Sequence, residues 1–98
     1  MRAGPAFLLG RAYAARHDYE LAAATFLWLP LVDDHDFRLS ARACFEAAVT
    51  MSKIGQQAES LRLYRETVQR YGETPSAAEA QRRLKAAAEP PSTTPQLK

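Results

Sequence analysis

The sequence predicts an all-α fold, and three observations support this prediction. Alanine is abundant while glycine occupies only 4 of 98 positions, a composition that favours helices over sheet. Apolar residues recur at steps of three and four positions, and no segment shows the two-residue alternation of a half-buried strand. The chain is long enough for one small domain with a modest core, which we expect to span residues 1–88.

The first two helices are expected over residues 4–16 and 19–29. Pro5 suits the first turn of a helix because its missing N–H is not needed there. Asp18 is a suitable N-cap for the second helix, and Pro30 is expected to end it. The apolar faces of these two helices are expected to comprise Phe7, Leu8, Leu9, Tyr13, Ala14, Leu21, Ala22, Thr25, Phe26 and Leu29.

The third helix is expected over residues 37–53, with Asp36 as its N-cap. Lys53 in the last turn and Gly55 just beyond it are typical of a helix C-terminus. Its apolar face recurs at three- and four-residue steps and comprises Phe37, Ala41, Cys44, Phe45, Ala48 and Met51.

The fourth and fifth helices are expected over residues 56–71 and 76–88. The fourth is expected to bury Ala58, Leu61, Tyr64, Thr67 and Val68. In the fifth, Ser76 and Glu79 fit the S-x-x-E capping box. Residues 89–98 contain three prolines and no apolar period, which predicts a disordered proline-rich tail.

A repeat of about 38 residues relates the two halves of this helical region. Three pairs of residues share the spacing: His17 and Gly55, Tyr13 and Met51, and Phe26 and Tyr64. A period in this range with two helices per unit indicates an α-solenoid. The match between His17 and Gly55 also predicts left-handed backbone geometry at His17, because histidine tolerates that region better than most residues.

The first unit resembles the tetratricopeptide repeat (TPR). That family's pattern W-x2-L-G-x2-Y…A-x3-F…P is matched by Leu9, Gly10, Tyr13, Ala22 and Phe26, with Ala6 in place of the tryptophan and Asp34 in place of the proline. The second unit is more divergent, with Ala47, Ala48, Met51, Ser60 and Tyr64 at the same offsets. The segment YGETPSAAEAQRRLKAA is similar to the ends of bacterial envelope-type TPR proteins. The resemblance implies a short α-solenoid of two TPR-like helix pairs plus a C-terminal capping helix.

The resemblance also implies a concave binding surface lined by the first helix of each pair. The residues expected on this surface are Phe7, Arg11, Arg42, Phe45, Val49, Lys53, Gln81 and Lys85. Apolar residues surrounded by cations favour a peptide or helix with acidic and hydrophobic side chains. The alternative interpretation places the two phenylalanines in the core. The family's carboxylate clamp of lysines and asparagines is not reproduced, because the chain has no asparagine.

A second possible interface involves Leu27 and Trp28, which lie between Phe26 and further apolar residues. One helix facing one core cannot bury so wide an apolar face. We therefore expect it to meet another repeat, a second copy of the chain or a protein partner. The chain is expected either to self-associate or to be a fragment of a longer TPR array.

Two other classes of function are less favoured. A nucleic-acid-binding helical domain would use the basic C-terminal helices, but acidic residues are interspersed and the net charge is only +2. The basic residues concerned are Arg62, Arg65, Arg70, Arg82, Arg83 and Lys85. A metal or acid–base site would need Asp33, Asp34, His35 and Asp36, but consecutive side chains diverge, and helix capping explains these acids.

No cofactor, metal or enzymatic activity is expected. The single cysteine, Cys44, lies on the apolar face of its helix and is interpreted as a small buried hydrophobe. The apolar run from Pro5 to Gly10 is too short for a secretory signal and is followed by Arg11. No run approaches the roughly 20 apolar residues of a membrane span, so a soluble protein is expected.

Overall fold

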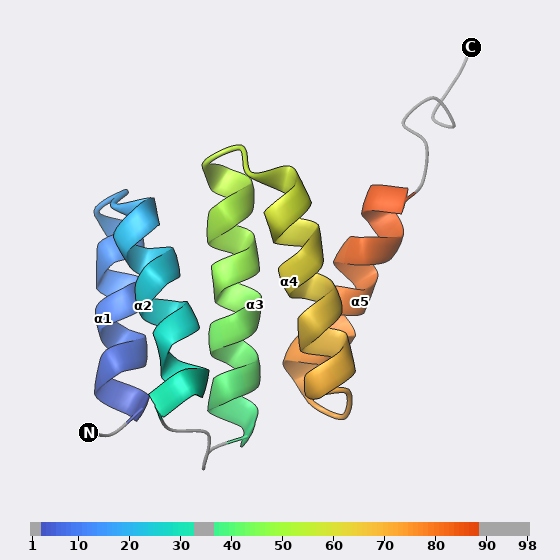
Figure 1. The fold of residues 1–98 in the computed structure, drawn as a ribbon, viewed down its shortest axis with the longest axis horizontal. Helices are drawn as coiled ribbons and strands as arrows, with labels where there is room; N and C mark the ends of the chain where they lie inside the picture. Colours follow the sequence, from blue (N-terminus) through green and yellow to red (C-terminus); the bar gives the residue numbers. More distant parts are fainter. Residues whose placement is uncertain (1–2, 33–36, 89–98) are drawn as a thin grey trace.

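The structure, a computed structural model, describes the backbone of residues 3–32 and 37–88, with the side chains of residues 6–28 and 37–88. These residues form five helices and no strand (Figure 1). The helices are α1 (Ala3–Ala15), α2 (Tyr19–Val32), α3 (Phe37–Lys53), α4 (Gln57–Arg70) and α5 (Pro75–Ala88). The all-α prediction is confirmed. The proline-rich segment expected to be disordered lies outside the described residues.

Consecutive helices pack against each other, and α3 lies at the centre of the fold (Figure 1). Helix α3 also packs against both α1 and α5, whereas the described parts of α2 and α4 do not pack against each other. Helices α1, α3 and α5 therefore form one layer, and α2 and α4 form the other. Contact with four neighbours leaves buried residues around most of α3, except on the side that carries Arg42. These buried residues are Ser40, Ala41, Ala43, Cys44, Phe45, Ala47, Ala48 and Thr50.

The turn between α1 and α2 is closed by backbone hydrogen bonds around His17. The φ angle of His17 is 66°, in the left-handed region. The amide of His17 donates to the carbonyl of Ala14 (3.0 Å), and the amide of Asp18 donates to the carbonyl of Tyr13 (2.9 Å). This pair of bonds is a Schellman motif, which satisfies carbonyls at the end of a helix. The predicted left-handed geometry of His17 is confirmed.

The turn between α3 and α4 has the same geometry. The φ angle of Gly55 is 82°. Its amide donates to the carbonyl of Ser52 (3.1 Å), and the amide of Gln56 donates to the carbonyl of Met51 (2.9 Å). Each of these residues lies 38 positions after its counterpart in the first turn. The repeat read from the sequence is thus a repeat of backbone structure at the two turns.

Aromatic packing inside each helix pair repeats with the same spacing. The rings of Phe7 and Phe26 have centroids 5.5 Å apart and planes inclined by 51°. The rings of Phe45 and Tyr64, each 38 residues later, have centroids 5.6 Å apart and planes also inclined by 51°. A Cβ atom at Gly10 would lie 2.6 Å from the ring of Phe26. Glycine at this position therefore allows α1 to approach the aromatic ring on α2.

The predicted apolar faces were wrong at several positions. Leu8, Leu9, Leu21 and Phe37 are between 46% and 64% exposed. Small residues such as Ala6, Ala22 and Ala23 occupy the helix contacts instead. Because these alanines let the helix backbones approach closely, the larger leucines of α1 and α2 are left on the outside. The predicted position Leu29 lies outside the described side chains.

On α4 the buried face is rotated from the predicted one. Ala58 is exposed, while Ser60 and Leu63 are buried. The hydroxyl of Ser60 donates to the carbonyl of Ala48 at 2.7 Å, which satisfies this polar group inside the core. Ser60 stands at the repeat position of Ala22, which is also buried.

Two helix boundaries also differ from the prediction. Helix α2 continues past Pro30 to Val32, since a proline inside a helix removes one backbone hydrogen bond and crowds the carbonyl four residues before it without always ending the helix. At the start of α5, the amide of Ala77 donates to Oγ1 of Thr74 (3.2 Å). Thr74 is thus the N-cap and Pro75 the first helical residue. The predicted capping box of Ser76 and Glu79 is wrong.

Candidate interaction surface

The structure places the two phenylalanines expected on the concave surface in the core. Phe7 is 7% exposed and Phe45 is 8% exposed. Each lies under a guanidinium from the next helix of the same layer. The Cζ atom of Arg42 on α3 is 5.7 Å from the centroid of the Phe7 ring, and that of Arg83 on α5 is 5.4 Å from the centroid of the Phe45 ring. The α1–α3–α5 face therefore presents planar cations above an aromatic floor.

Both of these arginines are held by a carboxylate on their own helix. Nε of Arg42 donates to Oε2 of Glu46 (3.2 Å), and Nε of Arg83 donates to Oε2 of Glu79 (3.3 Å). Such pairs fix the plane of the guanidinium and leave further N–H groups for a carboxylate ligand. Sequence reasoning missed Arg83 as a member of this face. Its four-residue spacing from Glu79 was visible, but its position over Phe45 depends on how α5 packs.

A shallow hollow of about 240 Å³ lies between α3 and the start of α5. Arg42, Phe45 and Glu46 line it from α3, and Pro75, Ser76 and Glu79 line it from α5. The hollow combines an apolar floor with charged and hydroxyl groups at its rim. This arrangement suits a protein side chain better than a small cofactor.

The remaining predicted residues of this face lie on the same three helices. Arg11, Lys53, Gln81 and Lys85 are exposed, and Val49 is partly buried. The ammonium of Lys53 is 5.8 Å from the centroid of the Tyr19 ring, which places it at the end of α3 nearest the α1–α2 turn. The layer thus carries exposed cations on α1, α3 and α5.

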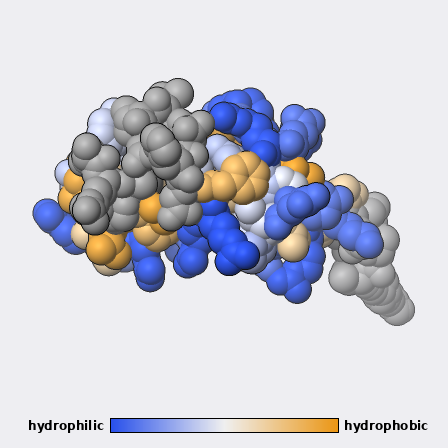
Figure 2. Space-filling view, turned by 90° about the horizontal axis from the view of Figure 1, so that it is seen from below, coloured by the Kyte–Doolittle hydropathy of each residue, from blue (hydrophilic) through white to orange (hydrophobic). Residues whose placement is uncertain are grey.

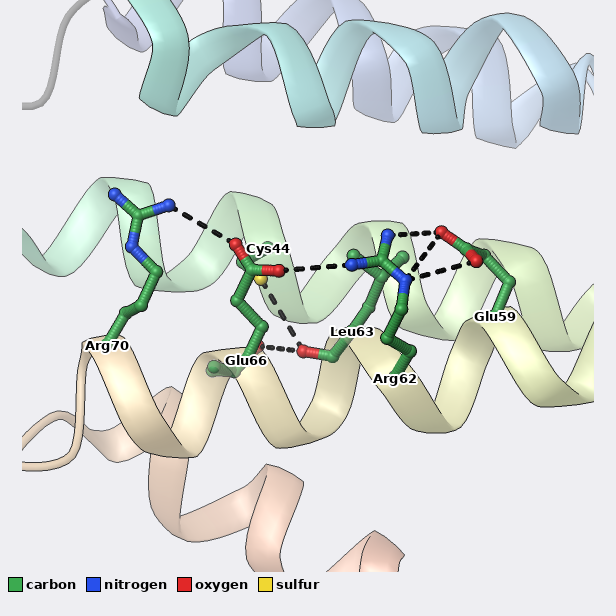
Figure 3. A network of polar contacts seen from close by, with 7 residues as sticks. Cys44, Glu59, Arg62, Leu63, Glu66 and Arg70 are labelled. Atoms are coloured by element: carbon green, nitrogen blue, oxygen red, sulfur yellow. Dashed lines mark hydrogen bonds and ion pairs between the residues drawn. The ribbon is translucent and has the colours of Figure 1, made fainter.

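The basic residues considered for nucleic-acid binding are largely paired with acids. On α4, Arg62 contacts both Glu59 and Glu66, and Arg70 donates to Glu66 at 3.2 Å (Figure 3). The hydrogen bond from Arg62 lowers the pKa of Glu59, and the hydrogen bond to Glu66 raises the pKa of Arg70.

On α5, Glu79 pairs with both Arg82 and Arg83. Of the six basic residues considered, Arg65 and Lys85 make no ion pair with another described residue. Local neutralisation of the other four argues against a phosphate-binding face.

Cys44 lies at the floor of a groove of about 270 Å³ between α2 and α4, beside Leu27 and Leu63. Its Sγ is 3.6 Å from the carbonyl oxygen of Leu63 (Figure 3). Burial raises the pKa of the thiol, so the thiol remains protonated at neutral pH and is a poor nucleophile. The interpretation of Cys44 as a small buried residue agrees with this environment.

Leu27 and Trp28, expected together at a second interface, lie in different environments. Leu27 is partly buried against the core, whereas Trp28 is 41% exposed. Trp28 lines an apolar hollow of about 350 Å³ together with Ala6, Leu9, Ala24 and Thr25. In Figure 2 hydrophobic side chains are visible beside the grey residues at the α1–α2 end, and hydrophilic ones are more frequent over α4 and α5. We call the surface formed by Leu9, Leu21, Ala24, Thr25 and Trp28 the α1–α2 apolar patch.

The segment considered as a metal or acid–base site, residues 33–36, lies outside the described residues. Within the described ranges, no three His, Cys, Asp or Glu side chains form a group that could hold a metal ion. Across residues 3–32 and 37–88, no helix is both long enough and apolar enough to cross a bilayer.

Neither protein-family models, curated proteins nor solved structures give a match to this chain. The repeated helix pair and the two surfaces on α1–α3–α5 and α1–α2 are therefore the observations that bear on its function.

Proposed function

We propose that the chain is a non-enzymatic protein–protein interaction module, a short TPR-like α-solenoid that binds a peptide or helix on its α1–α3–α5 face. The observation that carries this proposal is the repetition of turn and core geometry 38 residues apart, at His17 and Gly55 and at the two aromatic pairs. Repeated helix pairs of this kind build extended binding surfaces by stacking.

The packing of the helices supports the choice of face. Helix α3 packs against α1 and α5, but α2 and α4 remain apart within the described structure. When alternate helices are close in one layer and separated in the other, the stack curves toward the close layer. The α1–α3–α5 layer is then the concave side, and α5 is the capping helix.

The chemistry of this face favours an acidic ligand with an apolar side chain. Arg42 offers an exposed, oriented guanidinium, and Arg11, Lys53 and Lys85 add cations on the same three helices. The hollow between α3 and α5 has Phe45 in its lining, where an apolar side chain of the ligand displaces water.

Selection from a library of random peptides tests this proposal directly. We expect enrichment of peptides that combine acidic and apolar residues, with at least tenfold weaker binding to the Arg42→Glu variant. Arg65→Glu is the matched control, because Arg65 is exposed on α4, in the other layer, and it should bind as the original chain does. Equal binding by the Arg42→Glu variant, or failure to enrich such peptides, contradicts the proposal. Tight, salt-dependent binding of DNA or RNA instead would favour the nucleic-acid alternative.

A further inference from the structure

One side of α2 carries a pattern of large, small, small and large residues. Leu21, Ala24, Thr25 and Trp28 follow one another at helical spacings i, i+3, i+4 and i+7, which places them along one face. Leu21 is 53% exposed and Trp28 is 41% exposed. The pattern reads the same in both directions along the helix, with its centre between Ala24 and Thr25.

Thr25 is the one polar residue in this pattern, and its hydroxyl already has a hydrogen-bond partner. The hydroxyl of Thr25 donates to the carbonyl of Leu21 at 2.8 Å. Thr25 therefore needs no external hydrogen-bond partner, and none of the five residues of the α1–α2 apolar patch carries a charge. A second copy of the same surface would meet no like charge and no unsatisfied hydroxyl there.

The α1–α2 apolar patch also contains both projecting side chains and a hollow of the kind that receives them. Trp28 and Leu9 project as large exposed side chains, and the hollow of about 350 Å³ next to them is lined by Ala6, Ala24 and Thr25. A two-fold interface requires one surface to supply projection and hollow at once, because each copy contributes the same residues. The α1–α2 apolar patch meets this requirement.

The described part of the opposite end of the molecule, helix α5, does not offer a matching surface. Exposed residues of α5 include Gln81, Arg82 and Lys85, and hydrophilic side chains dominate there (Figure 2). Head-to-tail stacking would press these cations against Trp28 and remove them from water without a partner. A closed pair of like ends is therefore favoured over an open filament.

We propose that a second copy of the chain covers the α1–α2 apolar patch, with the two α2 helices antiparallel about a two-fold axis near Ala24. Leu21 of one copy then contacts Trp28 of the other, and the small residues at the centre let the two backbones approach. The α1–α3–α5 face lies on other sides of the helices, so the dimer presents two copies of the proposed peptide-binding surface.

Analytical ultracentrifugation with matched variants tests the dimer. Ala24 and Ala78 are both exposed helical alanines, so arginine at either position is compatible with folding. We expect the original chain and Ala78→Arg to be dimers at micromolar concentration, and Ala24→Arg to be a monomer with unchanged helix content by circular dichroism. A monomeric original chain, or a dimer that persists in Ala24→Arg, overturns the proposal.

Disulfide cross-linking of introduced cysteines tests the position of the proposed two-fold axis. The single natural cysteine, Cys44, is buried, so oxidation reports on an introduced thiol. Ala24→Cys is expected to cross-link to its own copy rapidly and almost completely under mild oxidation, since position 24 lies next to the axis, opposite Thr25 of the other copy and close to its own counterpart. Ala78→Cys should remain largely unlinked under the same conditions. Equal cross-linking of the two variants would contradict the proposed arrangement.

Failure of this dimer is distinguishable from failure of the proposed function. Ala24→Arg should bind the selected peptides with the same affinity per chain as the original protein, because Ala24 is on α2 and the proposed peptide face is on the other layer.

Trp28 is also the only tryptophan. Its fluorescence is expected to shift to shorter wavelength as the concentration rises through the dimerisation range, and an unchanged spectrum across that range in a dimeric sample counts against burial at the interface.

Discussion

The α1–α2 pair and the α3–α4 pair share their turns and aromatic contacts but differ in their outer surfaces. The described part of α4 carries a series of alternating acids and arginines, whereas Glu20 is the only charged residue of α2. Between the helices, Gly10 and Phe26 of the first pair correspond to Ala48 and Tyr64 of the second. The comparison shows that a few small residues and a left-handed turn define the helix pair, while the outward positions are free to diverge.

Position in the stack explains part of the divergence. Helix α3 has neighbours on both sides, whereas α1 packs against α2 and α3 on one side only. Among the described residues, no helix covers the outer side of the first pair, and its leucines and Trp28 are exposed. An apolar surface of this kind is typical of a protein–protein contact. The variants below test how far the two pairs are equivalent.

The largest effect is expected from Phe26→Ala. Phe26 is 1% exposed and fills the space between α1 and α2, so its truncation should lower the free energy of unfolding by about 3–5 kcal/mol. Tyr64→Phe at the equivalent position should change it by less than about 1 kcal/mol, because the lost hydroxyl accepts only a 3.4 Å bond from Arg83. Urea denaturation measures both, and a loss below about 1 kcal/mol for Phe26→Ala would refute its role in the core.

Gly10→Ala should come next, with a loss of about 1–2 kcal/mol. The added methyl would lie 2.6 Å from the buried ring of Phe26, and overpacking of this kind costs about 1–3 kcal/mol, partly offset by the better helix propensity of alanine. The reverse change in the second pair, Ala48→Gly, should also destabilise, by about 1–2 kcal/mol, because glycine has a lower helix propensity and a buried methyl group is lost. A stabilised Gly10→Ala variant in thermal unfolding would show that α1 and α2 are further apart than described.

Substitutions at the left-handed residues of the two turns should have smaller effects on stability, and they test the comparison in both directions. Gly55→Ala should destabilise by about 1 kcal/mol, because the φ angle is 82° although no atom lies within 4 Å of the added Cβ. His17→Gly should be neutral or slightly stabilising, since it removes a side chain from the same left-handed region. Thermal unfolding of both variants side by side measures the difference. Destabilisation by His17→Gly would indicate that the stacking of His17 on Tyr19, with ring centroids 5.4 Å apart, outweighs backbone strain.

The smallest effect concerns the charged surface of α4. The pKa of Glu59 is lowered in the folded chain by its hydrogen bond with Arg62. Its contribution to stability is therefore fully present above the ordinary glutamate pKa of about 4.3 and is lost as the pH falls through the lower folded value. Glu59→Gln should lose a few tenths of a kcal/mol at pH 7 and match the original chain near pH 2. A difference that grows as the pH falls would contradict this assignment.

Local features were predictable from the sequence, and features that depend on neighbouring helices were not. The helix order and the turns at His17 and Gly55 follow from local signals and the repeat, whereas the burial of Ser60 was not predicted. The exposure of Leu8, Leu9 and Leu21 did not follow, because an apolar segment rich in alanine has several possible inward faces. The position of Arg83 over Phe45 depends on the packing of α5 against α3, which no local pattern encodes.

The alanine-rich interior of α3 has a mechanical consequence. Its small side chains keep the backbones of the neighbouring helices close on both flanks. A larger side chain on this helix would therefore push those backbones apart. Displacement would be shared between the α1–α2 and α4–α5 ends at once. The central helix thereby acts as a rigid spacer between the α1–α2 and α4–α5 ends.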